Sequence, residues 1–177
     1  AEDVAVARRG AQALKPLALP PKNAPLRARA LDPRTPAALR QAALEAFEVD
    51  AEGEAALARI LNSEAGLGVR RAAAERLAKF PAGAVARRAL AAALPAAGTE
   101  LAILVAGALA QSEDGASTLV ALVGEGRAPA SLLRHGRVAP ALAKRAAGVR
   151  GRVAELTRDL PGEDARLDAV IAARIGA

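Results

Sequence analysis

The sequence lacks cysteine and has only two aromatic residues, Phe47 and Phe80, among its 177 residues. Without cysteine, this segment can form no disulfide, use no thiolate nucleophile and attach no haem covalently. Its longest apolar run, residues 101–110, is half of the roughly 20 residues that a transmembrane helix needs, and Gly107 interrupts it, so no membrane span is predicted. Methionine is absent as well, and we expect the chain to be a fragment or a processed product.

The apolar content consists mainly of small side chains. Hydrophobic residues make up 53% of the sequence, and more than half of them are alanine. Because alanine is the strongest helix former and has little preference for strands, the composition predicts an all-α protein with few large core residues. The expected core residues are Leu44, Phe47, Leu57, Ile60, Leu77, Phe80, Leu90, Leu94, Leu101, Leu104, Leu109, Leu119, Leu122 and Leu156.

The formal net charge of +6 makes nucleic acid or another anionic surface a candidate partner. Nearly all of the positive charge is arginine, and acidic residues are interspersed among the arginines. An ordinary solvated surface is therefore the favoured interpretation of the charge, and a nucleic-acid footprint is the alternative.

Prolines divide the first 34 residues of the chain. Five of them lie between residues 16 and 33. Each proline removes a backbone donor and disfavours helix at the residue before it. We expect residues 1–34 to form a proline-rich linker or a short helix, the helix being near residues 4–14, and we expect order to begin at Thr35.

From Thr35 onward the pattern is that of paired amphipathic helices. Thr35 followed by Pro36 predicts a helix start, and apolar residues continue at helical spacing to Phe47. Asp50 is predicted to cap the next helix, which ends at Asn62. The two helices together predict a hairpin.

This hairpin recurs along the chain. The segment LRQAALEAF at 39–47 aligns with VRRAAAERL at 69–77, an offset of 30 residues, and ALARIL at 56–61 aligns with ALAAAL at 89–94, an offset of 33. Small residues at fixed places let neighbouring helices approach closely, and a period of this length with helix-turn-helix content indicates an α-solenoid. Thr99 is predicted to cap the first helix of a third unit.

The pattern divides the rest of the chain into two regions. Residues 35–125 are predicted to be helical repeats in a right-handed α-solenoid. The repeat signal fades in residues 126–177, which we expect to form irregular helices packed on the array as a C-terminal cap. These helices are predicted near residues 129–134, 138–147, 149–160 and 163–175.

No group of residues has the composition of a catalytic or metal site. His135 is the only histidine, and a zinc site without cysteine would consist mostly of carboxylates. Close carboxylates such as Glu52 with Glu54, and Glu113 with Asp114, lie near predicted helix starts, where they can cap free amides. We therefore expect no catalytic, cofactor-binding or metal-binding residue and no enzyme activity.

Paired arginines are the best candidates for an interaction surface. In a solenoid, equivalent positions of successive repeats line up, so a row of arginines could follow a phosphate backbone. Aromatic residues for base stacking are absent from these segments, however, and glutamates are available as ion-pair partners. The candidate residues are Arg70, Arg71, Arg87, Arg88, Arg134 and Arg137.

Two resemblances add a context to this pattern. The segments at 39–47 and 69–77 resemble the opening helix of HEAT-type repeats, a fold of the armadillo type. Residues 112–138 and 153–174 are similar to the helical segment of large exported proteins from planctomycete-type bacteria, which combine a sugar-dehydrogenase-like β-propeller, a HEAT-like array and a C-terminal c-type cytochrome domain.

The second resemblance implies a role for this chain within a larger protein. It implies a non-catalytic scaffold that links a dehydrogenase-like domain to a c-type cytochrome domain, located in the periplasm or exported. Its partners would be neighbouring domains of the same polypeptide or another protein. Haem c is implied only for the adjacent domain, and no cofactor is expected in this chain. A nucleic-acid-binding solenoid remains the alternative.

Overall fold

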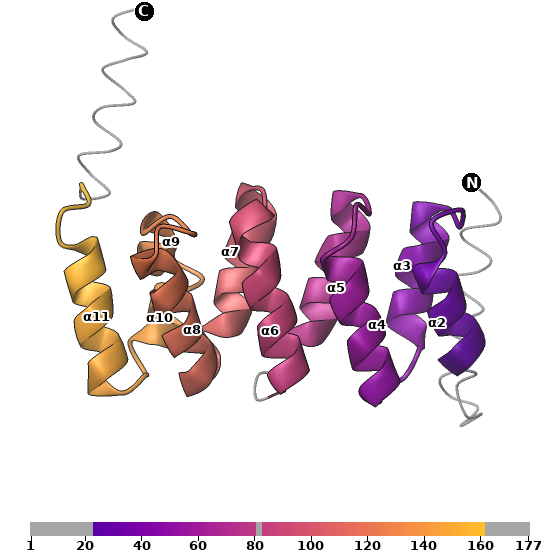
Figure 1. The fold of residues 1–177 in the computed structure, drawn as a ribbon, viewed down its shortest axis with the longest axis horizontal. Helices are drawn as coiled ribbons and strands as arrows, with labels where there is room; N and C mark the ends of the chain where they lie inside the picture. Colours follow the sequence, from indigo (N-terminus) through magenta and orange to yellow (C-terminus); the bar gives the residue numbers. More distant parts are fainter. Residues whose placement is uncertain (1–22, 81–82, 162–177) are drawn as a thin grey trace, which may run out of the picture.

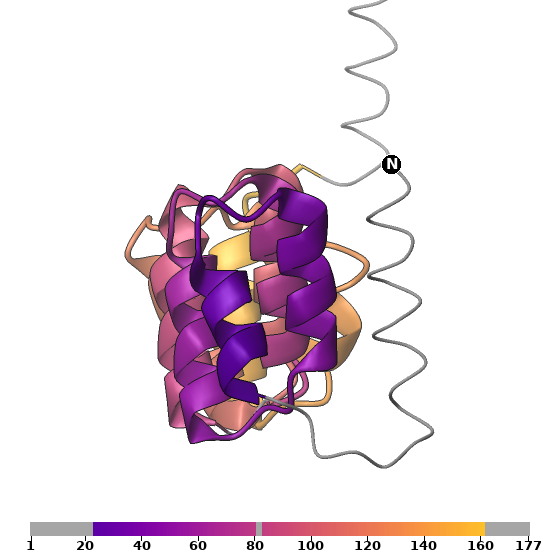
Figure 2. The same ribbon diagram turned by 90° about the vertical axis from the view of Figure 1, so that its right-hand side faces the viewer.

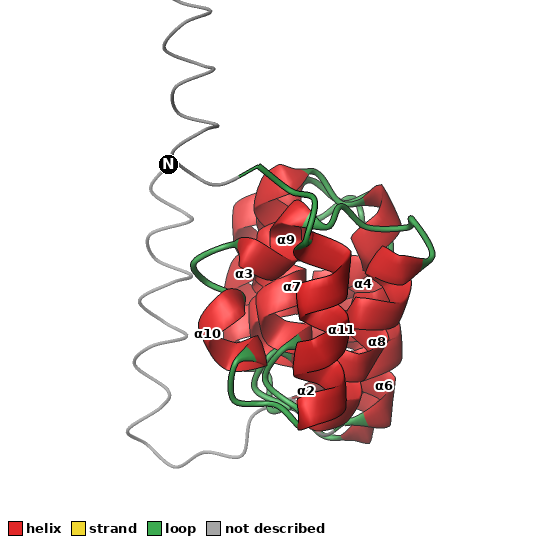
Figure 3. Ribbon diagram, turned by 90° about the vertical axis from the view of Figure 1, so that its left-hand side faces the viewer, coloured by secondary structure: helices red, strands yellow, loops and turns green. Residues whose placement is uncertain are grey.

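The computed structural model describes residues 23–80 and 83–161. Throughout these two ranges the regular structure is helical, and they contain no strand (Figure 3). The prediction of an all-α protein is therefore confirmed for the part of the chain that the structure describes. The elements are α2 (Asn23–Leu31), α3 (Ala37–Ala46), α4 (Ala51–Leu61), α5 (Leu67–Leu77), α6 (Ala84–Ala93), the 3₁₀ turn η2 (Leu94–Ala96), α7 (Thr99–Leu109), α8 (Glu113–Gly124), α9 (Ser131–Arg134), α10 (Ala139–Leu142) and α11 (Ala147–Thr157).

The helices stand side by side in two layers (Figures 1 and 2). One layer contains α2, α4, α6, α8 and α11, and each of these helices contacts the next. The other layer contains α3, α5 and α7, which α9 and α10 continue (Figure 3). Consecutive helices from α2 to α8 alternate between the layers, so helix α2 lies at one end of the row and α11 at the other.

Alanine sets the spacing of the helices in this core. Ala73 and Ala74 of α5 and Ala106 of α7 are completely buried. Such small side chains allow neighbouring helix backbones to approach closely, and large side chains then fill the space between the turns. Phe47, Leu44, Leu57, Ile60, Leu61 and Leu77 are the largest of these fully enclosed side chains in the first half of the row.

Most of the expected core residues are buried, with Phe80 as the clear exception. Leu104 and Leu156 are half-buried and pack against the core. Phe80 is 36% exposed, so its placement in the core is wrong. In the repeat alignment the position of Phe47 is occupied by Leu77, which is completely buried, and Phe80 lies beyond it in the turn after α5. Leu61, Leu133 and Leu142 are enclosed core residues that the sequence prediction did not include.

The N-terminal boundary differs from the prediction. Residues 23–31 form α2, which packs on α3, so the expectation that order begins at Thr35 is wrong. Pro25 is tolerated because it lies in the first turn of this helix, where backbone N–H groups have no intrahelical acceptor. The helix predicted near residues 4–14 lies outside the described residues.

The predicted helix starts are partly correct. Asp50 caps α4, because its Oδ1 accepts a hydrogen bond of 2.7 Å from the Gly53 N–H. Thr35 is not a cap: Pro36 occupies that position, and the Thr35 hydroxyl donates instead to the Asp32 carboxylate at 3.4 Å. Thr99 is not a cap either, because α7 begins one residue earlier than predicted and Gly98 precedes it.

In the described residues after α8, two four-residue helices, α9 and α10, precede the longer α11. Helix α8 ends at a turn in which Gly126 has a φ of 72° and the Arg127 N–H donates to the Leu122 carbonyl. This left-handed conformation favours glycine. The helix expected over 138–147 is confined to α10, since residues 143–146 form turns. The helix expected over 163–175 lies outside the described residues.

The two phenylalanines provide a direct test of the packing. Phe47 is 1% exposed, so Phe47→Ala should lower the free energy of unfolding by about 3–5 kcal/mol. Phe80→Ala should lower it by less than about 1 kcal/mol, because the ring is partly in solvent. Urea unfolding of both variants measures the difference, and equal losses would show that the assignment of the buried ring is incorrect.

Candidate interaction surface

Arginines at equivalent repeat positions bind the ends of preceding helices. The Arg40 Nε donates to the Ala30 carbonyl at 2.9 Å, which joins α3 to the end of α2. The Arg70 Nε donates to the Leu61 carbonyl, also at 2.9 Å, which joins α5 to the end of α4. The last carbonyls of a helix have no intrahelical partner, so each arginine satisfies an otherwise unpaired acceptor. The same geometry therefore occurs twice in this chain: the first helix of a hairpin provides a donor for the end of the helix before it.

Two further arginines also bind carbonyls at the end of a helix, and their partners lie farther away in the sequence. Arg76 of α5 donates to the carbonyls of Glu45 at 2.8 Å and Phe47 at 2.6 Å, and its guanidinium carbon lies 5.5 Å from the centre of the Phe47 ring. Burial lowers the pKa of Arg76 from its ordinary value, and the charge of Glu45 partly opposes this shift. Arg134 donates to the carbonyl of Thr157 at 2.8 Å and to that of Leu160 at 3.0 Å, so it holds the end of α11.

Acidic residues link the starts of successive helices in the layer of α2, α4, α6, α8 and α11. The Glu54 carboxylate accepts a hydrogen bond of 2.9 Å from the Ala86 N–H of α6, and Glu113 accepts one of 3.1 Å from the Ala146 N–H before α11. The predicted capping role of these carboxylates is thus seen at the next helix of the layer rather than at their own. Carboxylates at this position also interact favourably with the helix dipole.

Ion pairs complete this set of links. Arg27 of α2 binds the carboxylates of Asp50, at 2.9 Å, and of Glu52 at the start of α4. Arg87 of α6 binds Asp114 of α8 at 2.9 Å. Each helix of this layer is therefore joined to the next by at least one charged side chain.

The Asp50 carboxylate has a lowered pKa. The backbone N–H of Gly53 is the largest cause, and Arg27 adds a hydrogen bond and an attractive charge, while partial desolvation acts in the opposite direction. The ionised form of the Asp50 carboxylate therefore stabilises the folded state.

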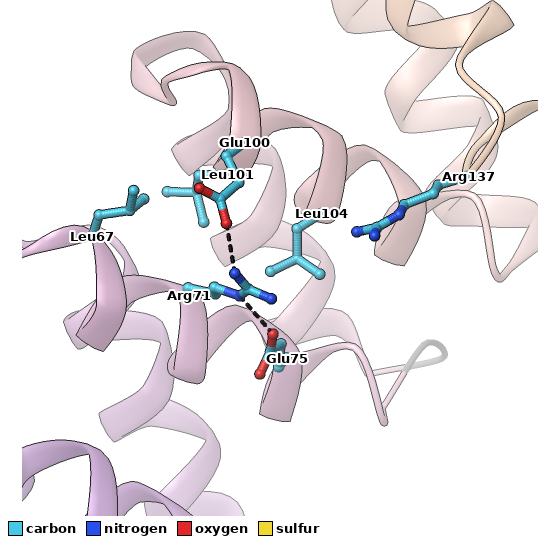
Figure 4. Close-up of a pocket in the computed structure, with 7 residues that line it drawn as sticks. All are labelled: Leu67, Arg71, Glu75, Glu100, Leu101, Leu104 and Arg137. Carbon is cyan, nitrogen blue, oxygen red and sulfur yellow. Dashed lines mark hydrogen bonds and ion pairs between the residues drawn. The ribbon is translucent and has the colours of Figure 1, made fainter. Parts of the chain in front are cut away.

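A small hollow of about 50 Å³ lies between α5 and α7 (Figure 4). Arg71 crosses it and binds Glu75 at 2.9 Å and Glu100 at 2.5 Å. The hydrogen bond that Arg71 donates to the Glu75 carboxylate is the main cause of a raised pKa of Arg71. The other residues around the hollow are Leu67, Leu101, Leu104 and Arg137.

The six candidate arginines do not form one row. Arg70 and Arg134 donate to backbone carbonyls, and Arg71 and Arg87 form ion pairs. Only Arg71 and Arg137 line the same hollow. Within the described residues, the side chains of Arg88 and Arg137 make no hydrogen bond or ion pair. The roles of Arg40, Arg76 and Arg27 were not predicted, because a bond to a distant helix end leaves no local signal in the sequence.

The only histidine has a local structural contact. The Nδ1 of His135 accepts a hydrogen bond of 3.2 Å from the Arg137 N–H. Ser131, four residues earlier, begins α9 and is exposed, and its side chain does not cap that helix. In the described ranges, no three or more His, Asp or Glu side chains form a group that could hold a metal ion. The search of the same ranges finds no helix with the length and apolarity that a membrane span requires.

Comparison with protein-family models, with curated proteins and with solved structures finds no match for this chain. The interpretation of the surface therefore depends on the residues and contacts described above.

Removal of an arginine that binds a helix-end carbonyl should destabilise the fold more than removal of an arginine without such a contact. Arg70→Ala removes the donor to the Leu61 carbonyl and should lower the free energy of unfolding by about 1–3 kcal/mol, because a partly buried acceptor loses its charged partner. Arg88→Ala is the matched control and should change it by less than about 0.5 kcal/mol. Denaturant unfolding tests both variants, and similar values for the two would argue against the capping role.

The lowered pKa of Asp50 predicts a pH dependence. The ionised carboxylate contributes stability above its unfolded-state pKa of about 4, and this contribution is lost as pH falls through the lowered folded-state value. Asp50→Asn can keep the hydrogen bond from Gly53 but cannot titrate, so stability should fall less between about pH 5 and about pH 2 than in the wild type. Glu64→Gln serves as a control, since Glu64 is exposed and its side chain makes no hydrogen bond or ion pair among the described residues. An unchanged acid slope in Asp50→Asn would contradict the assignment.

Proposed function

We propose that this chain is a non-catalytic scaffold and interaction module, built as a right-handed α-solenoid of HEAT-like helical hairpins. The observation that carries the proposal is the recurrence of the same links at successive junctions. Arg40 and Arg70 occupy equivalent positions and bind equivalent helix ends. Repeated units that complete one another in this way are typical of solenoid proteins.

The position of the two ends supports a spacer role. Helices α2 and α11 lie at opposite ends of the row, so domains joined beyond them would be held apart by the length of the array (Figure 1). The layers between these ends present extended helical faces to solvent. Such surfaces are the usual binding sites of helical-repeat proteins.

The contacts of the arginines favour a protein partner over nucleic acid. A phosphate-binding row needs several guanidinium groups that are free to face the backbone of the nucleic acid. Arg70 and Arg134 instead bind carbonyls, and Arg71 and Arg87 bind carboxylates. Four of the six candidate arginines are thus already engaged in contacts within the described part of the chain.

The resemblance of residues 112–138 and 153–174 adds the molecular context to the proposal. In that context the scaffold links a dehydrogenase-like domain to a c-type cytochrome domain, in the periplasm or in an exported protein. Haem c would then belong to the neighbouring domain. The described residues in these two segments are those that form α8, α9 and α11, at the end of the row.

The parent gene and a binding measurement together test this function. The gene should encode a Cys-x-x-Cys-His motif beyond residue 177, and the domain that carries this motif should bind the purified chain in trans, as measured by calorimetry. Duplex and single-stranded DNA at low salt are the comparison ligands.

Two results would overturn the proposed function. Tight DNA binding that weakens steeply as salt rises would establish the nucleic-acid alternative, because counterion release gives phosphate contacts that signature. Absence of the motif, or of binding to its domain, would remove the link to a cytochrome.

A further inference from the structure

The hollow between α5 and α7 is bordered by three leucines, two arginines and two glutamates. Leu101 is buried and Leu104 half-buried on α7, while Leu67 at the start of α5 is 50% exposed. Leu67 is thus a large apolar side chain that borders the hollow and remains open to solvent. A second apolar group placed here would remove this surface from water.

The two arginines at the hollow differ in how many of their N–H groups already have a hydrogen-bond acceptor. Arg71 binds Glu75 through Nε and Glu100 through Nη1, so other N–H groups of its five donors remain available. The Arg137 side chain makes no hydrogen bond or ion pair within the described residues. In Figure 4 the guanidinium of Arg137 points toward Leu104 from one side, and Arg71 lies on the other side of that residue.

The backbone of Arg137 is held in place against α7. Its N–H donates to the His135 Nδ1 at 3.2 Å, and the next residue, Val138, is completely buried. Its carbonyl oxygen lies so near Gly107 of α7 that a Cβ added there would be 3.7 Å away. An arginine on a fixed backbone loses less conformational freedom when it binds a ligand than one on a free loop.

We propose that this hollow docks a protein partner through a segment that carries an apolar side chain next to an Asp or Glu side chain. The apolar side chain packs over Leu67 and Leu104, and the carboxylate accepts hydrogen bonds from Arg137. This inference rests on the proposed scaffold function and names the chemistry of its partner.

The charges around the hollow select this ligand among anions. Glu75 and Glu100 lie beside Arg71 and would repel the successive phosphates of a nucleic acid, whereas a single carboxylate can bind Arg137, which lies on the other side of Leu104 from Arg71 (Figure 4). A chain-terminal carboxylate is commonly captured by backbone N–H groups, but the residues here contribute side chains. An internal acidic residue is therefore the best match.

Short capped peptides provide the probe. The library pairs Leu, Ile, Val or Phe with Asp or Glu at several spacings, and acetylated and amidated ends leave the side-chain carboxylate as the only one. Fluorescence anisotropy measures binding to the whole chain. The best peptide should lose affinity when its acidic residue becomes Asn or Gln, and when its apolar residue becomes Ala.

Protein variants locate the binding site. Arg137→Gln and Leu67→Ser should each weaken the best peptide by about tenfold. Arg88→Gln is the matched control, because Arg88 is exposed on α6 in the other layer and its side chain makes no hydrogen bond or ion pair among the described residues. This substitution should change affinity by less than about twofold. Circular dichroism and thermal unfolding verify that each variant folds.

Four results would overturn the proposal: no binding by any library peptide, equal binding by the amide versions, equal losses in Arg137→Gln and Arg88→Gln, or tighter binding by peptides with a free C-terminus.

The docking site and the scaffold function can be contradicted independently of each other. If the flanking domain binds the chain while no peptide does, the docking site is wrong and the scaffold stands. If peptides bind through Arg137 and the flanking domain does not bind, the docking site stands and the link to that domain is wrong.

Discussion

Unpaired backbone groups at helix ends are the constraint on which this structure depends. A fold of short helices has many ends, and each end leaves N–H or C=O groups without an intrahelical partner. In this protein neighbouring helices provide the partners. Arg40 and Arg70 bind the carbonyls of the preceding helix, and Glu54 and Glu113 bind amides of the next helix in their layer. Neighbouring helices thus satisfy backbone groups that each helix alone would leave without a partner.

The parts of the fold that depend on local patterns could be predicted from the sequence. The helical period over 39–47, the repeat at 69–77 and the Asp50 cap all involve residues within a few turns of one another, and the structure contains each of them. Phe80 was misplaced because burial of a residue just past a helix end depends on the direction of the turn. Its neighbour Leu77, three residues earlier, has the enclosed position.

The surface was harder to predict than the fold, because it depends on contacts between distant residues. Arg70 and Arg71 are adjacent and chemically identical, but one binds the Leu61 carbonyl and the other Glu75 and Glu100. Helical geometry directs neighbouring side chains to different sides, and the sequence does not show which carbonyl or carboxylate lies there. A count of charges treats every arginine as available to a ligand. In this fold the arginines that bind helix ends keep their charge but have a fixed position and a fixed acceptor.

Contacts between helices are confined to near neighbours, and this has a mechanical consequence. The row behaves as elastic elements in series: α2 contacts α4, α4 contacts α6 and α6 contacts α8, so a small rotation at each junction adds to the next. A pull on the two ends is therefore shared among the junctions, and the distance between α2 and α11 can change while each individual interface is only slightly deformed. A segment bound between α5 and α7 would stiffen one of these junctions and so alter the extension of the whole row.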